Sequence, residues 1–380
     1  MARAALAPSP PAFPAPPSRL RSRRSPLAPR ATSSPAVTPG PRPPPAPATW
    51  GDDNRLRFTP DPSVTRKVAP PGAPPVVILP GFGNDANDYV APFGDADASL
   101  KASLERRGWR VHVVDLERKD WARILRGVFS RGFYSGDGTT EPGYTWYLER
   151  VDAAVRAALE AEGPGGATQV DLVAHSAGGW LARAFVGGAL NEVEYDKPFR
   201  YWAPREGQST RAAPKHAVPH PSVRTIVTLG APHRVAEGPN ANDATRGALK
   251  WVDERWPGAT FARGDDDGGG GGIGGGGIGG GVGYCCVSGR TVRGVASRDA
   301  KGTLAGYSAG SYAQVCGEGD GVEGDAVVPN AYAFLEGAEN IVVDGCFHSM
   351  SRVGTYDEDS GEVWYGSEEV VDVWLGALLR

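Results

Sequence analysis

The segment QVDLVAHSAGGWLARAF, residues 169–185, constrains the fold more than any other part of this sequence. Its first half is a short apolar run typical of a buried strand, and its second half has the pattern of a helix. The corner between them holds Ser176, with Ala174, Gly178 and Gly179 close to it. Such small residues let a helix pack tightly against the strand that precedes it. We therefore expect a sharp strand–turn–helix unit with a serine at the turn.

Five further apolar runs have the same strand-like character. They are PVVILPG at 75–81, WRVHVVDL at 109–116, VRTIVTLG at 223–230, YCCVSG at 284–289 and NIVVDG at 340–345. Their dense valine, isoleucine and leucine are typical of a parallel sheet covered on both faces. Helical patterns lie between them, over 147–163 and over the C-terminal segment, which Ser367 is expected to cap. This alternation predicts an α/β fold with a mostly parallel sheet and helices on both faces.

Three segments match no regular element, namely 119–146, 191–222 and 264–283. The first two are rich in aromatic side chains, which either line an apolar pocket or lid or pack in the core. The third is the run GDDDGGGGGIGGGGIGGGVG, which buries almost nothing. We interpret it as a flexible, low-complexity insertion.

The first fifty residues have a composition of their own. They are rich in alanine, proline, serine and arginine, and no acidic residue occurs before Asp52. This composition is typical of an organelle transit peptide, and prolines break both the apolar core of a secretory signal and the amphipathic helix of a mitochondrial presequence. We therefore expect a disordered plastid transit peptide over 1–50 and one folded domain over 51–380. A mitochondrial address and a basic tail without any address are the alternatives.

The charge and composition of the chain argue against some classes of binding partner. The formal net charge of −4 gives no basic footprint, which argues against a nucleic-acid partner. No apolar run approaches the roughly 20 residues of a membrane-spanning helix. The four cysteines form no C-x-x-C pair, so the sequence has no zinc-binding or thioredoxin signature. The sequence does not decide whether these cysteines are free thiols or form a disulfide.

The serine corner predicts a nucleophile. The pattern around Ser176 is G-x-S-x-G with Ala174 in the first position, and a nucleophile elbow of this type holds its serine in a strained conformation with Oγ exposed. The alternative is an ordinary strand–turn–helix that happens to contain a serine. A catalytic serine also needs a base, an acid that orients the base, and an oxyanion hole.

Among the six histidines, His348 is the best candidate for the base. It follows the last predicted strand, in the loop where the order serine, acid, histidine would place it. His175 sits on the corner itself, where shaping the pocket is the better interpretation, and a structural role is expected for His233. The other three are His112 in an earlier strand and His216 and His220 in an irregular segment.

The acid should lie between YCCVSG and His348, which leaves Asp320, Asp325 and Asp344. Asp344 is only four residues from His348, so its carboxylate would have to double back. Asp320 lies among glycines, with nothing apolar to anchor it. Asp325 precedes the sequence AVVP, which can pack the loop, and we prefer it, with Asp320 next.

The oxyanion hole is expected from two backbone N–H groups, those of Ala177 after the serine and Phe82 in the LPGFGND loop. The same loop matches the dinucleotide-binding pattern G-x-G-x-x-A, with Asp115 as a ribose ligand. However, Asp115 lies 34 residues after Gly81, beyond the roughly 20 expected. A dinucleotide-binding oxidoreductase would also leave the serine corner unexplained.

Together, LPGFGND, VDLVAHSAGGWLARAF, VTLGAPH, GDAVVP and LEGAENIVVDGCFHS resemble the lipase-like α/β-hydrolases of plant and algal plastids, which are related to esterases and to GPI inositol-deacylase-like proteins. The resemblance covers roughly residues 75 to 375. It implies an α/β-hydrolase domain over 51–380, and it places Asp325 at the acid position. Ala174 and the polyglycine insertion depart from the pattern, and the N-terminal antiparallel strands are hard to find between 51 and 74, so a shortened sheet is expected.

The sequence thus predicts a serine esterase or lipase with Ser176 as nucleophile, His348 as base and Asp325 as orienting acid. No cofactor or metal is expected. The substrate would be a small-molecule or lipid ester, with peripheral membrane contact in the lipid case. An acyltransferase using the same acyl-enzyme and a non-catalytic binding module on the same fold are the alternatives.

Overall fold

A six-stranded parallel sheet forms the centre of the computed structural model, which describes residues 49–190, 219–236, 243–263, 281–349 and 362–380. The strand order is β2-β1-β3-β4-β5-β8, and every neighbouring pair is parallel. The strands are β1 (Val76–Leu79), β2 (Val111–Val113), β3 (Val170–His175), β4 (Val223–Leu229), β5 (Gly283–Arg290) and β8 (Glu339–Asp344). All six predicted strands are confirmed.

Helices and short strands surround this sheet. The α-helices are α1 (Asn87–Val90), α2 (Leu100–Glu105), α3 (Arg131–Ser135), α4 (Thr145–Glu162), α5 (Ala177–Val186), α6 (Ala248–Arg255), α7 (Leu304–Cys316) and α8 (Glu368–Trp374). The 3-10 segments are η1 (Pro92–Gly94), η2 (Arg118–Phe129), η4 (Asn330–Tyr332) and η6 (Leu375–Leu379). Two-residue strands form two small sheets, antiparallel β6 (Val292–Arg293) with β7 (Glu323–Gly324), and parallel β9 (Cys346–Phe347) with β10 (Val363–Trp364).

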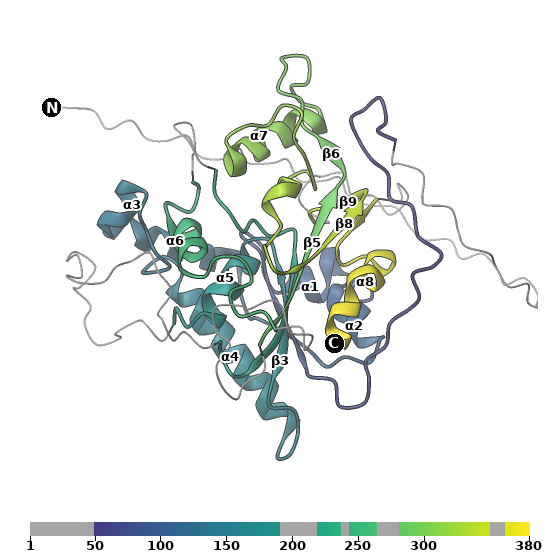
Figure 1. The fold of residues 1–380 in the computed structure, drawn as a ribbon, viewed down its shortest axis with the longest axis vertical. Coiled ribbons are helices and arrows are strands. Elements are labelled where there is room, and N and C mark those ends of the chain that lie inside the picture. The colour runs from purple at the N-terminus through teal and green to yellow at the C-terminus, as the bar shows by residue number, and fades with distance from the viewer. Residues whose placement is uncertain (1–48, 191–218, 237–242, 264–280, 350–361) are drawn as a thin grey trace, which may run out of the picture. The chain divides into compact units, whose positions relative to one another are not determined.

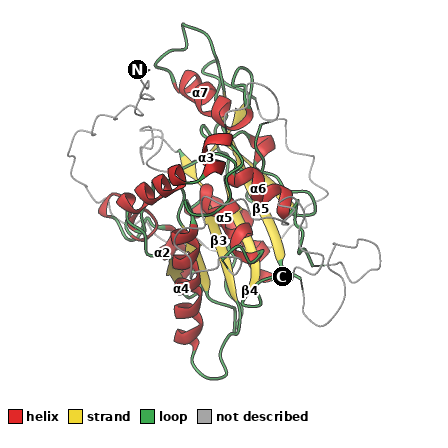
Figure 2. Ribbon diagram, turned by 90° about the vertical axis from the view of Figure 1, so that its left-hand side faces the viewer, coloured by secondary structure: helices red, strands yellow, loops and turns green. Residues whose placement is uncertain are grey.

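Successive strand residues point to opposite faces, and each face has its own core. In β1, Val77 and Leu79 pack with the apolar side of α4, α5 and α6, whereas Val76 and Ile78 pack with α2 and α8. Figure 1 shows these helices on the two sides of the sheet, and Figure 2 shows α4 and α5 in front of the strands. All four side chains are completely buried, and each contributes roughly 1.5–3 kcal/mol relative to exposure.

The layered architecture confirms the predicted fold class. Ahead of β1, the described residues 49–75 form no strand, only an isolated bridge from Arg55 to Val292. Within the described residues, no antiparallel strand precedes β1, as expected. No helix in the described ranges is long and apolar enough to cross a membrane.

The borders of some predicted elements need correction. Gly283 is the first residue of β5, so the predicted insertion 264–283 ends inside the sheet, because its backbone pairs with Thr225 of β4. Ser367 precedes α8 but does not cap it, because its Oγ accepts the N–H of Trp364 instead. Residues 1–48, 191–218 and 264–280 lie outside the described part, so the transit peptide stays a prediction.

The aromatic segment 119–146 turns out to be partly core and partly surface. Trp121, Tyr144 and Trp146 are buried under η2 and α4 and join the core beside α5. Phe129 and Tyr134 are 62% and 71% exposed. Core packing thus accounts for the first group, and the second group forms part of an open surface.

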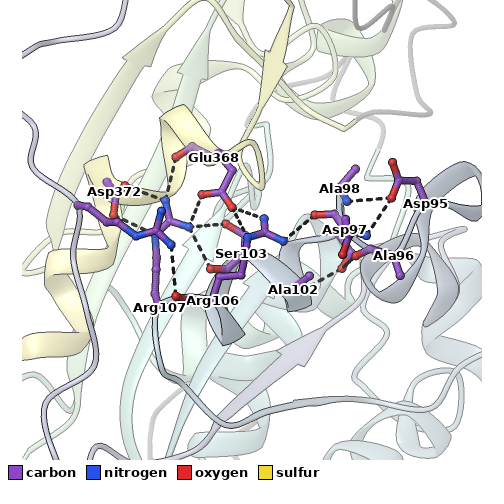
Figure 3. A network of polar contacts seen from close by, with 12 residues as sticks. Asp95, Ala96, Asp97, Ala98, Ala102, Ser103, Arg106, Arg107, Glu368 and Asp372 are labelled. Atoms are coloured by element: carbon purple, nitrogen blue, oxygen red, sulfur yellow. Dashed lines mark hydrogen bonds and ion pairs between the residues drawn. The ribbon is translucent and has the colours of Figure 1, made fainter. Parts of the chain in front are cut away.

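A buried arginine joins α2 to α8 (Figure 3). Arg107 follows α2, and its guanidinium donates to both carboxylate oxygens of Asp372 in α8, with Nη2 2.7 Å from Oδ2 and Nε 3.0 Å from Oδ1. It also pairs with Glu368 and donates to Ser103. The Arg107 side chain is 1% exposed, whereas that of Arg106, which pairs with Glu368 from outside, is 39% exposed.

We expect Arg107→Leu to lower the free energy of unfolding by about 3 kcal/mol, because it leaves Asp372 partly buried without its cation. Arg106→Leu is the matched control and should cost under about 1 kcal/mol, since its pair faces solvent. Urea unfolding at pH 7 measures both. Equal losses in the two variants would contradict the assignment.

The same arginine predicts a pH dependence. Burial raises the pKa of Asp372, but the hydrogen bonds from Arg107 and from the backbone N–H of Lys67, together with the nearby positive charges, outweigh it, so the net pKa is lowered from 3.8. A carboxylate with a lowered folded-state pKa adds stability above its unfolded value and loses it as the pH falls through the folded value. The wild type should therefore lose this contribution below about pH 4, and Arg107→Leu should show a smaller acid-dependent loss.

Candidate active site

Ser176 occupies a strained corner between β3 and α5. Its φ of 52° and ψ of −126° lie outside the regions that a serine ordinarily adopts, which costs on the order of 1–3 kcal/mol. The surroundings hold it there, since its N–H donates to the carbonyl of Leu229 at 2.9 Å. The predicted strand–turn–helix unit is confirmed, and its strain is of the kind found at functional sites.

The small residues around the corner are required by close contacts. A Cβ added to Gly178 would lie 2.7 Å from the carbonyl oxygen of Leu79, and one added to Gly179 would lie 2.3 Å from Cβ of Ala231. Ala174 is completely buried, so a methyl group fits where the pattern usually has glycine. From the other side, a Cβ on Gly81 would lie 2.7 Å from Cβ of Ser176. The LPGFGND loop therefore touches the serine.

The structure joins Asp325 to His348. Asp325 follows β7 and is completely buried, and its Oδ2 lies 2.8 Å from Nδ1 of His348. The backbone repeats the link, because the N–H of His348 donates to the carbonyl of Asp325 at 2.9 Å. Two glycines of the sheet make room for the acid: a Cβ on Gly230 would lie 2.6 Å from its Oδ2, and one on Gly289 would lie 2.9 Å from its Cβ.

The other two acid candidates lie elsewhere. Asp320 is exposed, and its Oδ1 accepts the N–H of Ala296. Asp344 forms a two-pronged ion pair with Arg290 at the end of β8. Of the three carboxylates, only Asp325 lies within hydrogen-bond distance of His348.

Four donors surround the buried carboxylate of Asp325. Its Oδ1 accepts the N–H groups of Val327 and Val328, at 3.0 and 2.7 Å. Its Oδ2 accepts Nδ1–H of His348 and, at 2.7 Å, the hydroxyl of Tyr365. These bonds replace the water that a buried carboxylate has lost. Tyr365 lies 40 residues from Asp325 and belongs to no sequence motif.

His175 lies behind His348. Its Nδ1 is 2.7 Å from the hydroxyl of Tyr89, its Nε2 is 2.8 Å from the carbonyl oxygen of His348, and its ring lies 4.7 Å from the His348 ring between centroids. Both ring nitrogens thus have partners other than Ser176. The hydroxyl of Tyr89 also accepts the N–H of Gly81 at 3.0 Å, so this chain ties the loop beside the serine to the His348 backbone.

The remaining described histidines have structural positions or contacts. His233 is completely buried, and its Nε2 is 3.1 Å from Oγ1 of Thr228. Burial lowers the pKa of His233 well below its usual value, so it stays neutral. His220 stacks on Phe185, His112 lies in β2, and His216 lies outside the described residues.

Two backbone N–H groups flank the serine. Ala177 is the first residue of α5, so its N–H has no acceptor within that helix. This N–H lies at the N-terminus of the helix, which is the positive end of the helix dipole. Phe82 follows Gly81, and among the described residues its N–H has no hydrogen-bond partner. Its ring is 51% exposed and rests edge-on against Trp121, with 5.2 Å between centroids.

Ser176 Oγ and His348 form no hydrogen bond with each other. Such bonds are often long without a substrate and tighten when it binds. A cavity of about 250 Å³ is lined by Asn84 of the LPGFGND loop and by Ser349, the residue after His348, while Ser176 and His348 themselves are not part of its wall. Asp115, the ribose ligand of the dinucleotide hypothesis, has a 94% exposed side chain beside Arg150.

The strand order, the corner and the order serine, aspartate, histidine are now in place. The fold is that of the α/β-hydrolases. A Bacillus licheniformis lipase in its mature form is similar over 74% of this chain and 89% of its own, at 15% identity and a TM-score of 0.37. The propeptide form of that lipase is similar over 74% and 48%, at 16% identity and 0.36.

A tomato methylketone synthase I, complexed with 2-tridecanone, is more distant. It covers 52% of this chain and 53% of its own length, at 13% identity and a TM-score of 0.19. No family model and no curated protein sequence matches this chain. Likeness at this level says nothing about the substrate of this chain.

Proposed function

We propose that this protein is a serine hydrolase that cleaves carboxylic esters through an acyl-enzyme on Ser176. The observation that carries the proposal is the buried hydrogen bond from Nδ1 of His348 to Asp325 beside the strained serine corner. A histidine whose Nδ1–H is held by a carboxylate presents an unprotonated Nε2. That nitrogen is the base that a serine nucleophile needs.

The reaction follows from these positions. Nε2 of His348 accepts the proton of Ser176 as Oγ attacks the acyl carbon. The N–H groups of Phe82 and Ala177 then bind the oxyanion of the tetrahedral intermediate. The intermediate collapses as His348 returns the proton to the leaving alcohol, and water, activated in the same way, releases the acid. An acceptor alcohol in place of water would make the same site an acyltransferase.

A series of p-nitrophenyl esters of increasing chain length tests this proposal directly. Turnover that depends on Ser176 supports a hydrolase, and the preferred chain length reports the size of the acyl site. Adding glycerol to the assay separates the two outcomes, since an acyltransferase forms glyceride at the expense of free acid. A folded protein that turns over none of these esters nor lipid extracts would refute the proposal.

We further propose that the esters are acyl lipids presented at a surface. The support is a face on η2 and α3, the η2–α3 face, where Leu125, Phe129 and Tyr134 are 65%, 62% and 71% exposed. Arg126 and Arg131 are exposed among them. Apolar side chains together with arginines suit a membrane that carries anionic lipid.

The η2–α3 face adjoins the site. Trp121 of η2 packs against Phe82, whose N–H is assigned to the oxyanion hole, and the Phe82 ring is itself half exposed. The segment η2, which carries part of this face, thus also contacts the loop beside Ser176. The face links the proposed substrate class to the proposed chemistry.

The double substitution Leu125→Glu and Phe129→Glu should weaken binding to vesicles containing phosphatidylglycerol by about tenfold or more, because each buried apolar side chain contributes roughly 1.5–3 kcal/mol. Hydrolysis of soluble p-nitrophenyl butyrate should stay near the wild-type rate. The matched control is Val68→Glu with Leu379→Glu, whose residues are also exposed but lie outside the η2–α3 face. Vesicle sedimentation measures binding, and equal losses in the two double variants would refute this face.

A further inference from the structure

The hydroxyl of Tyr365 shares Oδ2 of Asp325 with the imidazole of His348. The two donors lie 2.7 and 2.8 Å from that oxygen. We propose that Tyr365 is a positioning residue that limits how strongly Asp325 attracts the His348 ring. The inference rests on the proposed function, in which His348 takes the proton of Ser176.

The direction of the tyrosine hydrogen bonds follows from its neighbours. The N–H of Gly289 lies 2.7 Å from the Tyr365 oxygen and can only donate. The Tyr365 oxygen is therefore the acceptor in that contact, and its own hydrogen points to Asp325. Trp374 fixes the backbone, because its Nε1–H donates to the carbonyl of Tyr365 at 3.0 Å.

The tyrosine remains a donor around neutral pH. Tyr365 is completely buried, and burial together with the charge of Asp325 raises its pKa well above the usual value. The phenol therefore never ionises in competition with the carboxylate. Its hydrogen bond to Asp325 is charge-assisted, which makes it stronger than a neutral one.

The consequence for His348 is electrostatic. When one carboxylate oxygen accepts two hydrogen bonds, the charge that it offers to each donor is reduced. Without the hydroxyl, Oδ2 would accept a hydrogen bond from His348 alone, and the carboxylate would stabilise the imidazolium form of His348 more strongly. His348 would then stay protonated to a higher pH, and the fraction of enzyme able to accept the serine proton at neutral pH would fall.

Other groups around the pair are neutral or engaged elsewhere. His175 on β3 bonds to Tyr89 and to the His348 backbone. Cys346 on β9 is a buried thiol with a raised pKa. Tyr312 on α7 donates to Val292 and accepts from Ala326, one residue beyond Asp325. Tyr312 is therefore a second buried tyrosine close to Asp325, and its hydroxyl does not bond to the carboxylate.

Tyr365→Phe and Tyr312→Phe form a matched pair of variants. Each removes one buried hydroxyl, and only the first removes a donor to Asp325. The titration of the His348 ring protons by NMR, assigned with His348→Gln, should move to higher pH by about one unit in Tyr365→Phe, the size expected for one lost hydrogen bond to a charged group. It should move by less than about 0.3 unit in Tyr312→Phe.

The acid limb of kcat/KM for a soluble ester should shift by the same amount in Tyr365→Phe. A titration of His348 that is unchanged, or that moves equally in both variants, would overturn the inference. The NMR titration needs no turnover, so a protein without esterase activity would refute the proposed function and still decide whether Tyr365 acts on His348.

A third variant covers the case in which Tyr365→Phe does not fold. Difluorotyrosine placed at position 365 keeps the hydroxyl and makes it a stronger donor. The titration of His348 should then move to lower pH, opposite to the phenylalanine variant. A shift in the same direction as Tyr365→Phe, or no shift, would contradict the proposed role.

Discussion

Ser176→Ala should abolish labelling of the protein by a fluorophosphonate probe and lower ester turnover by roughly a millionfold. Such probes react with serines activated by a neighbouring base. Among the serines that the structure describes, Ser176 alone combines the strained corner with the two flanking N–H groups, and for this reason we expect it to react. Peptide mapping of the labelled wild type should place the adduct on Ser176.

Ser288→Ala is a suitable control for this experiment. Ser288 is also buried and lies in β5, which β4 separates from β3, and its Oγ accepts a hydrogen bond from Asn330 at 3.0 Å. Its loss should affect stability by about 1 kcal/mol and leave labelling in place. If the Ser176 variant were labelled as strongly as the wild type, the nucleophile would have to be assigned elsewhere.

Much of the fold could be predicted because its signals are local. Each sheet strand contains branched apolar residues because both faces of the sheet are covered, although polar residues such as Asp171 and His175 of β3 also occur. The corner at Ser176 is equally local, since Gly178 and Gly179, which let α5 approach the end of β1 and Thr228 of β4, directly follow it in the sequence.

The parts that the sequence did not show depend on distant contacts. Tyr365 bonds to Asp325 only because β9 and β10 bring the chain end back beside β5. Tyr89 reaches His175 across 86 residues. Ser367 has the right residue type for a helix cap, yet the N–H of Trp364 competes for its oxygen. Local patterns carry no information about such competition.

The acid of the proposed triad depends both on residues next to it in the sequence and on residues far from it. The choice of Asp325 came from the apolar residues after it, which were expected to pack the loop. In the structure Val328 is buried, and the N–H groups of Val327 and Val328 bind Oδ1 directly. The glycines at 230 and 289, which leave space for the carboxylate, belong to other strands and gave no signal in the sequence.

Asp325→Asn should keep the fold and lower kcat by roughly ten-thousandfold. The asparagine side chain has one oxygen, which accepts hydrogen bonds, and one NH₂ group, which donates them. Either of the two can face Nδ1 of His348, and an NH₂ group in that place excludes a proton on Nδ1. If the NH₂ group faces Nδ1, the imidazole carries its proton on Nε2 and cannot accept from Ser176. If the carbonyl oxygen faces Nδ1, the imidazolium loses the charge that stabilises it. Both arrangements weaken the base.

Asp320→Asn is the control that separates the two acid candidates. Asp320 is exposed and accepts only the N–H of Ala296 among the described residues, a bond that an asparagine side chain can also accept. Its replacement should therefore change kcat by less than about tenfold. Circular dichroism and urea unfolding of both variants show whether the fold is retained. A large loss in Asp320→Asn together with near-normal activity in Asp325→Asn would reverse the assignment, because a buried carboxylate bonded to His348 could then have only a structural role.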